Sequence, residues 1–212
     1  MLVAQAILTR YLGMAEYLST VEAMRDFTAR RNADTADELW LLEHPPVYTL
    51  GLAADAAHGP RAGNGIPVVQ VERGGEVTYH GPGQLVLYGL VDLARRGVKV
   101  KQYVTMLEQS VIDLLGGRGE PGAPRGERVA GAPGVYVDGA KIAALGIRVS
   151  RGCAFHGLAL NVDMDLAPFA AIDPCGHPGL KVTQTRDLGF DFSVQSAGAQ
   201  LVAILAGKLD YA

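Results

Sequence analysis

The chain has 212 residues, of which 49% are hydrophobic and 19% are charged, so it is long and apolar enough to bury a core. We expect one domain that spans residues 1–212. The formal net charge of −3 excludes a protein that is basic over its whole surface, and we expect no nucleic-acid partner.

The N-terminal apolar run ends at Arg10, far short of a membrane span, and it has no basic segment or cleavage site of a signal peptide. We therefore expect no membrane partner. The two cysteines, Cys153 and Cys175, are too few for a disulfide framework. These features favour the cytoplasm, with both thiols free.

The first half of the chain contains clear helix and strand patterns. "LVAQAILTRY" suits a strand, and apolar residues at helical spacing predict a helix over residues 14–31. "ELWLLEH" and "IPVVQVE" indicate strands, separated by a loop that is rich in Pro and Gly and contains His58. "QLVLYGLVDL" (84–93) is apolar on both faces, which is typical of a strand inside a covered sheet. A second helix begins at Val100 and stops at Gly116-Gly117.

The second half begins with residues 116–132, which have no apolar period and are interpreted as a mobile surface loop. Asp138-Gly139 predicts a two-residue hairpin turn and places Lys141 near the start of the returning strand. "HGLALNVD" indicates another strand, and residues 193–208 a closing helix with Ser193 as N-cap. Strands outnumber helices without regular alternation, so we predict an α+β fold with a mixed sheet flanked by helices.

A short basic run follows the central strand. Arg95, Arg96, Lys99 and Lys101 lie close together and offer a docking patch for an acidic protein. An ordinary solvated surface is the other interpretation of this run.

Cys175 lies in "IDPCGHPG", between Pro174 and Gly176, and is a candidate nucleophile. An unperturbed thiol is only about 3% ionised at pH 7, so a nucleophilic cysteine needs a neighbouring base or cation. His177 is the local candidate, and Lys141 is a more distant one. A buried, inert thiol is the alternative.

The sequence also contains residues that suit a metal site and a glycine-rich ligand site. Cys153 and His156, taken with Cys175 and His177, offer four nitrogen and sulfur ligands, which would suit a zinc-stabilised binding module. The close spacing of the second pair disfavours that interpretation. The chain has no nucleotide-binding glycine motif. The segment "RGGEVTYHGPGQ" (73–84) suggests either a Gly-flanked strand or loop that lets a ligand lie against the backbone, or a plain pair of turns.

Three longer segments carry a resemblance. They are "RGGEVTYHGPGQLVLYGLVDL", "APGVYVDGAKIAALGIRVSRGCAFHGLALNVDMDL" and "FAAIDPCGHPGLKVTQ". In this order they resemble the signature blocks of the octanoyl-carrier-protein:protein octanoyltransferases of lipoate biosynthesis, over residues 2–185 or so.

The resemblance implies the catalytic-domain fold of biotin and lipoate protein ligases. It also implies an acyltransferase that takes an octanoyl group from acyl carrier protein onto an enzyme cysteine. The acyl group then passes to a lysine of lipoyl domains, such as those of 2-oxoacid dehydrogenases, or of the glycine cleavage H protein. The thioester donor is already activated, so no ATP and no cofactor is expected. An ATP-dependent ligase on the same fold, which needs no cysteine, is the alternative.

The resemblance also assigns residues. It places the thioester on Cys175 and gives Lys141 the role of lowering the pKa of that thiol, which requires the hairpin to lie beside residues 172–179. His177 stands where the family often has tyrosine and is interpreted as a local variant. His80 and His156 are candidates for shaping the site, and a core histidine with one satisfied hydrogen bond is the alternative for each. The implied substrate-binding residues are Arg73, Gly74, Gly75, Glu76, Val77, Thr78, Tyr79, His80, Ala144, Leu145, Gly146, Gly157, Leu158 and Ala159.

Overall fold

The computed structural model describes residues 7–60, 65–117, 123–174 and 178–210. Cys175 and His177 therefore lie outside the described residues. Within the described ranges, none of the helices has the length and apolarity needed to cross a bilayer.

The main sheet has seven strands in the order β1-β2-β6-β10-β9-β8-β7. Strands β1 and β2 are parallel and the other neighbours are antiparallel, so the sheet is mixed as predicted. A second sheet has the order β4-β3-β5. The strands are β1 (Leu8–Met14), β2 (Glu38–Glu43), β3 (Val47–Leu50), β4 (Val68–Gln70), β5 (Val77–His80), β6 (Gln84–Asp92), β7 (Glu127–Val129), β8 (Ala132–Val137), β9 (Ala140–Ser150) and β10 (Cys153–Asn161).

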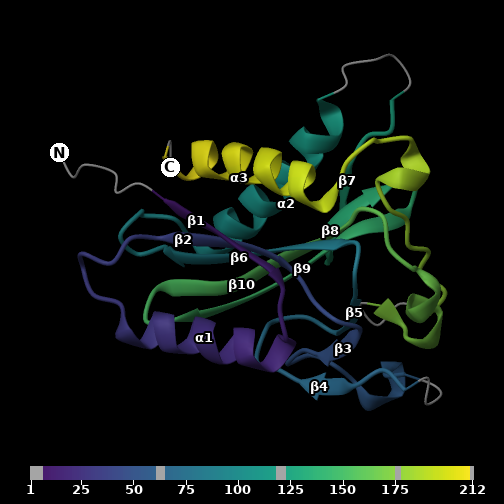
Figure 1. Ribbon diagram of the computed structural model, residues 1–212, viewed down its shortest axis with the longest axis horizontal. Helices are drawn as coiled ribbons and strands as arrows, with labels where there is room; N and C mark the ends of the chain where they lie inside the picture. Colours follow the sequence, from purple (N-terminus) through teal and green to yellow (C-terminus); the bar gives the residue numbers. More distant parts are fainter. Residues whose placement is uncertain (1–6, 61–64, 118–122, 175–177, 211–212) are drawn as a thin grey trace.

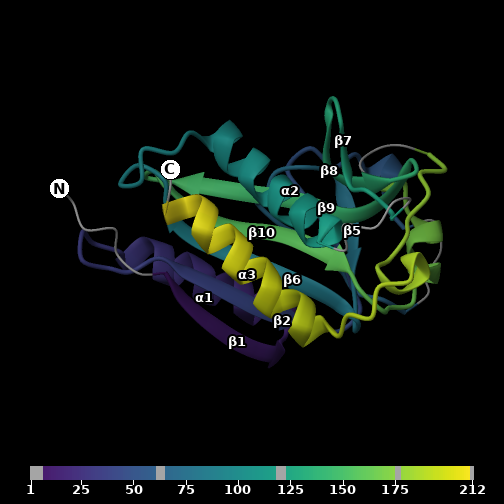
Figure 2. The ribbon, with the colours of Figure 1, turned by 90° about the horizontal axis from the view of Figure 1, so that it is seen from above.

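Three helices cover the main sheet. Helices α2 (Val100–Gly116) and α3 (Val194–Asp210) lie on one face, and α1 (Tyr17–Arg30) and the small sheet lie on the other (Figure 1). Figure 2 shows α2 and α3 crossing the sheet above β6 and β10. The architecture is thus the expected α+β arrangement of a mixed sheet flanked by helices.

Strand β6 shows why a central strand is apolar on both faces. Leu85, Leu87 and Val91 belong to the hydrophobic core under α2 and α3, whereas Val86 and Tyr88 belong to the core under α1. Each such side chain contributes about 1.5–3 kcal/mol when it leaves water completely. The sequence-based prediction of a covered strand is confirmed.

The hairpin that carries Lys141 is confirmed as well. Val137 pairs with Ala140, and the two turn residues, Asp138 and Gly139, have φ angles of 50° and 76°. Positive φ at both positions defines the type I′ turn that Asp-Gly favours. Lys141 is consequently the second residue of β9.

Two strands were not predicted. Strand β3 lies in a segment for which the sequence predicts a loop. Strand β7, Glu127–Val129, lies within the segment expected to be a mobile surface loop. Strand β7 forms because it pairs with β8 and because Arg128 binds helix α2 through Glu108. Both contacts are distant in sequence, so the local composition gives no sign of them.

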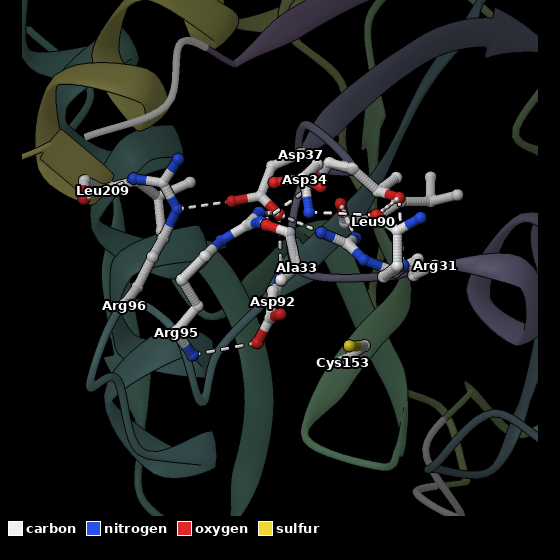
Figure 3. Close-up of polar contacts among 12 residues, drawn as sticks. Arg31, Ala33, Asp34, Asp37, Leu90, Asp92, Arg95, Arg96, Cys153 and Leu209 are labelled. Atoms are coloured by element: carbon white, nitrogen blue, oxygen red, sulfur yellow. Dashed lines mark hydrogen bonds and ion pairs between the residues drawn. The ribbon is translucent and has the colours of Figure 1, made fainter. Parts of the chain in front are cut away.

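Arg95 and Arg96 do not belong to an exposed docking patch. Both guanidiniums bind the carboxylate of Asp37, which is fully buried, and Arg31 binds it from the end of α1 (Figure 3). The backbone N–H of Asp92 donates to the same carboxylate at 2.8 Å. Neither interpretation of this basic run was right for these two residues, because their charges are used inside the fold.

Candidate active site

A cavity of about 310 Å³ lies between the main sheet and the small sheet. On the main sheet it is lined by a stretch of β9 and β10 where Gly157 pairs with Gly146 and Ala159 pairs with Ala144. Alternate residues of a strand share a face, so these four small residues lie together and leave room above the sheet. The volume is at the lower end of the range for small-molecule sites.

The segment of residues 73–76 and strand β5 close the cavity from the other side. They approach the sheet so closely that a Cβ at Gly146 would lie 2.7 Å from the carbonyl oxygen of Gly74. Tyr17, at the start of α1, and Tyr88, on β6, complete the wall. The further lining residues are Arg73, Gly75, Glu76, Val77, Thr78, His80, Val86, Gly131, Ala132, Pro133, Leu145, His156 and Leu158.

One end of the cavity is polar. Arg73 is buried and donates to the carbonyl and the hydroxyl of Thr49 at 2.8 and 2.7 Å. His156 is 1% exposed, has a φ of 62°, and neither ring nitrogen has a hydrogen-bond partner among the described residues. Burial, together with the positive charge of Arg73, lowers the pKa of His156 to about 4, so the ring is neutral at pH 7.

Two more buried histidines support this wall. His44 hydrogen-bonds the hydroxyl of Tyr88 at 2.8 Å and the carbonyl of Ala15 at 2.6 Å. His80 hydrogen-bonds Gln84 Oε1 at 2.7 Å. Burial lowers the pKa of His44 to about 4 and that of His80 to about 3. Both rings are therefore neutral and rigidly held.

Lys141 lies beside the opposite end of the cavity. Its side chain is buried, and its ammonium donates to the carbonyl of Pro133, one of the lining residues, at 2.9 Å. The nitrogen also lies 5.2 Å from the centre of the Tyr136 ring, within the range of a cation–π contact. The carbonyl dipole of Pro133 and the π-face of Tyr136 both interact favourably with an ammonium group in this position.

The hairpin lies next to the segment that follows Cys175. The backbone of Lys141 donates to the carbonyl of Lys181 and accepts from the N–H of Thr183. On the other side of Cys175, Pro174 lines a small hollow together with Lys141. The chain thus passes close to Lys141 both before and after residues 175–177.

The structure brings most of the expected substrate-binding residues together around the cavity. Gly74 and Tyr79 lie outside the lining, since Gly74 donates to the Ile147 carbonyl and Tyr79 packs against Tyr48 and Phe169. Residues that sequence reasoning did not single out also contribute: Tyr17, Val86, Tyr88, Gly131, Ala132 and Pro133. For most of these residues the sequence pattern predicts only a buried core position or a loop, and it gives no sign of a binding site.

The metal alternative rests on residues of which two are not described. Among the described residues no group of three or more His, Cys, Asp or Glu side chains is placed to hold a metal ion. Cys153 lies at the start of β10, where it pairs with Asp92, far from Lys141 along the strands. Cys153 therefore lies at the other end of β9 from Lys141.

Comparisons with known proteins agree with this fold. Residues 16–206 match the family model of the lipoyl protein ligase A/B catalytic domain. A putative lipoate protein ligase from T. acidophilum, solved with bound lipoic acid, superimposes with a TM-score of 0.74 at 16% identity and covers 98% of this chain and 86% of that one. A biotin protein ligase from Aquifex aeolicus gives a TM-score of 0.55 at 11% identity, over 98% and 69%. Fold and cavity together define a catalytic domain of the lipoyl ligase class.

Sequence relatives narrow that class. The octanoyltransferase of Thiobacillus denitrificans is 58% identical over 200 residues, which cover 94% of this chain and 89% of the relative. The octanoyltransferase of Methylococcus capsulatus is 57% identical over 204 residues, 96% of each chain. At this identity over nearly the whole length, the chain belongs to the octanoyltransferase family and is a transferase enzyme.

Proposed function

We propose that this enzyme transfers an octanoyl group from acyl carrier protein to a lysine of a lipoyl domain, through a thioester on Cys175. Two findings support the reaction: the relatives are named octanoyltransferases, and the cavity has a stretch lined by the small residues Ala144, Gly146, Gly157 and Ala159. An octanoyl tail that buries six methylenes and a methyl gains roughly 5 kcal/mol, so such a cavity is a sufficient binding site.

The position of Lys141 carries the mechanism. Its ammonium binds the carbonyl of Pro133 at the edge of the cavity. Lys141 also lines the small neighbouring hollow together with Pro174, the residue before Cys175. A positive charge near a thiol stabilises the thiolate and lowers the pKa of Cys175. The acyl chain then extends along β9 from the Lys141 end of the cavity in the direction of Gly146.

The proposed reaction has two balanced steps. The Cys175 thiolate attacks the carbonyl carbon of the donor thioester, the carbon–sulfur bond to the carrier breaks, and the carrier sulfur leaves as a thiol with the proton that the Lys141 ammonium gives up. The amine of the acceptor lysine then attacks the new thioester, an amide forms, and Cys175 leaves as the thiolate. Lys141, as a neutral amine in the second step, takes the proton that the attacking amine loses. The amide is more stable than the thioester, so the transfer runs forward without ATP.

Intact mass spectrometry tests the thioester. Incubation with octanoyl carrier protein alone is expected to add one octanoyl group, removable with hydroxylamine and mapped to Cys175. The matched variant Cys175→Ala is expected to acquire no such group. Full transfer to a lipoyl domain by Cys175→Ala would overturn the mechanism, and octanoate with ATP replacing the carrier donor would reveal the ligase alternative.

A further inference from the structure

We propose that Glu108 is a positioning residue for Lys141 and acts through the peptide bond between Pro133 and Gly134. This inference rests on the proposed function, because that function gives Lys141 its role. Glu108 lies on α2, on the opposite side of the hairpin from the cavity.

The peptide between Pro133 and Gly134 bridges the two side chains. Its carbonyl accepts from Lys141 Nζ at 2.9 Å, and its N–H donates to Glu108 Oε1 at 3.0 Å. No cis peptide bond occurs in the described residues, so this carbonyl and N–H point in opposite directions. The positive N–H end of the peptide dipole therefore faces the Glu108 carboxylate, and its negative carbonyl end faces the Lys141 ammonium.

Glu108 is an unusual residue for its place. It is 6% exposed and lies next to Leu107 and near Val111 on the buried side of α2, where a carboxylate is costly unless it is paired. Its second oxygen accepts from Arg128 Nε at 3.0 Å, and Arg128 is partly exposed on β7. Both oxygens are thus satisfied by β7 and β8, and the carboxylate fixes these strands to the helix.

Gly134 makes the coupling tight. A Cβ on this residue would lie 2.6 Å from Lys141 Cε and 3.0 Å from Nζ, and its φ of 142° favours glycine. The peptide and the lysine side chain are therefore in direct contact, and a shift of the peptide moves the ammonium. Hydrogen bonds that share one peptide also strengthen each other, so the carboxylate makes the Pro133 carbonyl a better acceptor.

Other described contacts hold the backbone and the ammonium of Lys141. Lys181 and Thr183 hold its backbone, and the Tyr136 ring lies beside its ammonium. The other residues that line the small hollow beside Lys141 are uncharged: Thr78, Gln84, Ala143, Ala144, Asn161, Phe169, Pro174 and Val182. The Pro133 carbonyl is thus a contact through which Glu108, on another element, can set the position of the charge.

The experiment compares Glu108→Ala with Glu108→Gln. The alanine variant leaves the Gly134 N–H without its acceptor, whereas the glutamine oxygen still accepts that hydrogen bond. Glu108→Ala is expected to shift the pH midpoint for iodoacetamide labelling of Cys175 upward, toward the ~8.5 of a free thiol, and to lower turnover about 100-fold. Glu108→Gln is expected to keep both properties close to those of the unchanged enzyme.

Glu38→Ala is the matched control for loss of a buried carboxylate. Glu38 is 3% exposed and binds Arg10 and Trp40. It lies on β2, which β6 and β10 separate from the hairpin strand β9. Glu38→Ala is expected to lower the melting temperature without moving the labelling midpoint. If Glu108→Ala behaves in the same way, the inference is wrong.

Two further variants keep the outcomes separate. Gly134→Ala retains Glu108 but forces the peptide and Lys141 apart, so it is expected to raise the midpoint even if Glu108→Ala fails to fold. Lys141→Met tests the proposed function itself. If Lys141→Met leaves the midpoint unmoved, the pairing of Lys141 with Cys175 fails. If it moves the midpoint while Glu108→Ala and Gly134→Ala do not, only the role of Glu108 fails.

Discussion

The main sheet holds a buried charged group at each of its two ends. Asp37 lies at the end where β6 finishes at Asp92, and Lys141 lies at the end where β6 begins at Gln84. Asp37 is surrounded by three guanidiniums and a backbone N–H, all from this chain (Figure 3). The Lys141 ammonium donates instead to a neutral carbonyl, beside a cavity.

The two buried charges differ in their role: Asp37 stabilises the fold, whereas Lys141 is proposed to take part in the reaction. Burial opposes the charge of Asp37, but the Asp92 N–H and the Arg96 and Arg31 guanidiniums outweigh it and keep the pKa of the carboxyl below its usual range. Such a carboxylate is satisfied within the fold and holds its loops together. The Lys141 ammonium, by contrast, lies beside a cavity, where we propose that it acts on the thiolate of Cys175.

The largest expected effect is at Lys141. Lys141→Met is predicted to lower acyl transfer by about 10³-fold, since it removes both the charge and the proton acceptor. The same change is predicted to leave the free energy of unfolding equal or higher, because an apolar residue replaces a buried charge. Steady-state transfer assays and urea unfolding check the two halves.

Lys141→Arg divides the two roles of the lysine. It is predicted to keep the low labelling midpoint of Cys175 because a positive charge remains, yet to lose transfer because arginine does not release its proton. Normal turnover by this variant would contradict the proton-transfer role and leave the electrostatic role standing.

Asp37→Asn tests the other end and is predicted to act oppositely. It removes the buried charge that three arginines share, which is expected to cost about 3–5 kcal/mol of folding free energy. Transfer per folded molecule is predicted to stay unchanged. Asp34→Asn, an exposed neighbour in the same loop, is the matched control and is expected to have little effect. A lower turnover in correctly folded Asp37→Asn would show that the two ends are coupled.

Local features of the molecule were predictable from the sequence, because the signal and the structure involve the same few residues. The Asp-Gly turn is one example, and the cap of α3 is another, with Ser193 Oγ accepting from the N–H of Ser196 at 3.0 Å. The central strand was predictable because its apolar faces directly report the layers that cover it.

Charged residues whose partners are distant in sequence were not predictable. Arg95 binds a carboxylate 58 positions away, and Glu108 binds a peptide 26 positions away. In the sequence the first resembles a surface residue and the second an ordinary break in an apolar helix. The expectation that Lys141 lies near residues 172–179 came from the family resemblance. The separation of the two segments in the sequence gives no indication of it.

Acid is predicted to act on the cavity side before it acts on Asp37. His44, His80 and His156 have lowered pKa values of about 4, 3 and 4 when folded, while an unfolded histidine titrates near 6.5. The unfolded chain therefore binds more protons below pH 6.5, so this stability is complete above that pH and is lost as the pH falls toward 4. From pH 7.5 to 5.5 the three together are expected to lose about 4 kcal/mol.

Urea unfolding at several pH values measures this loss, and hydrogen exchange locates it. Protection is expected to fall first in β5 and β10, which carry His80 and His156, and later in the loop that contains Asp37. A stability that stays constant from pH 7.5 to 5.5 would show that these histidines bind protons within the fold.

The smallest effect is expected at Cys153, which belongs to the Asp37 end. Burial, followed by the charge of Asp92, raises the pKa of its thiol, and Sγ contacts the Arg151 carbonyl at 3.8 Å. Cys153→Ala is therefore predicted to keep most of the transfer activity and to lose about 1 kcal/mol of stability, as a small cavity forms. In Cys175→Ala, where Cys153 is the remaining thiol, iodoacetamide at pH 7 is expected to label almost nothing. Equal loss of activity from the two cysteine variants, with metal found in the purified protein, would instead restore a shared metal site and remove the contrast between the two ends.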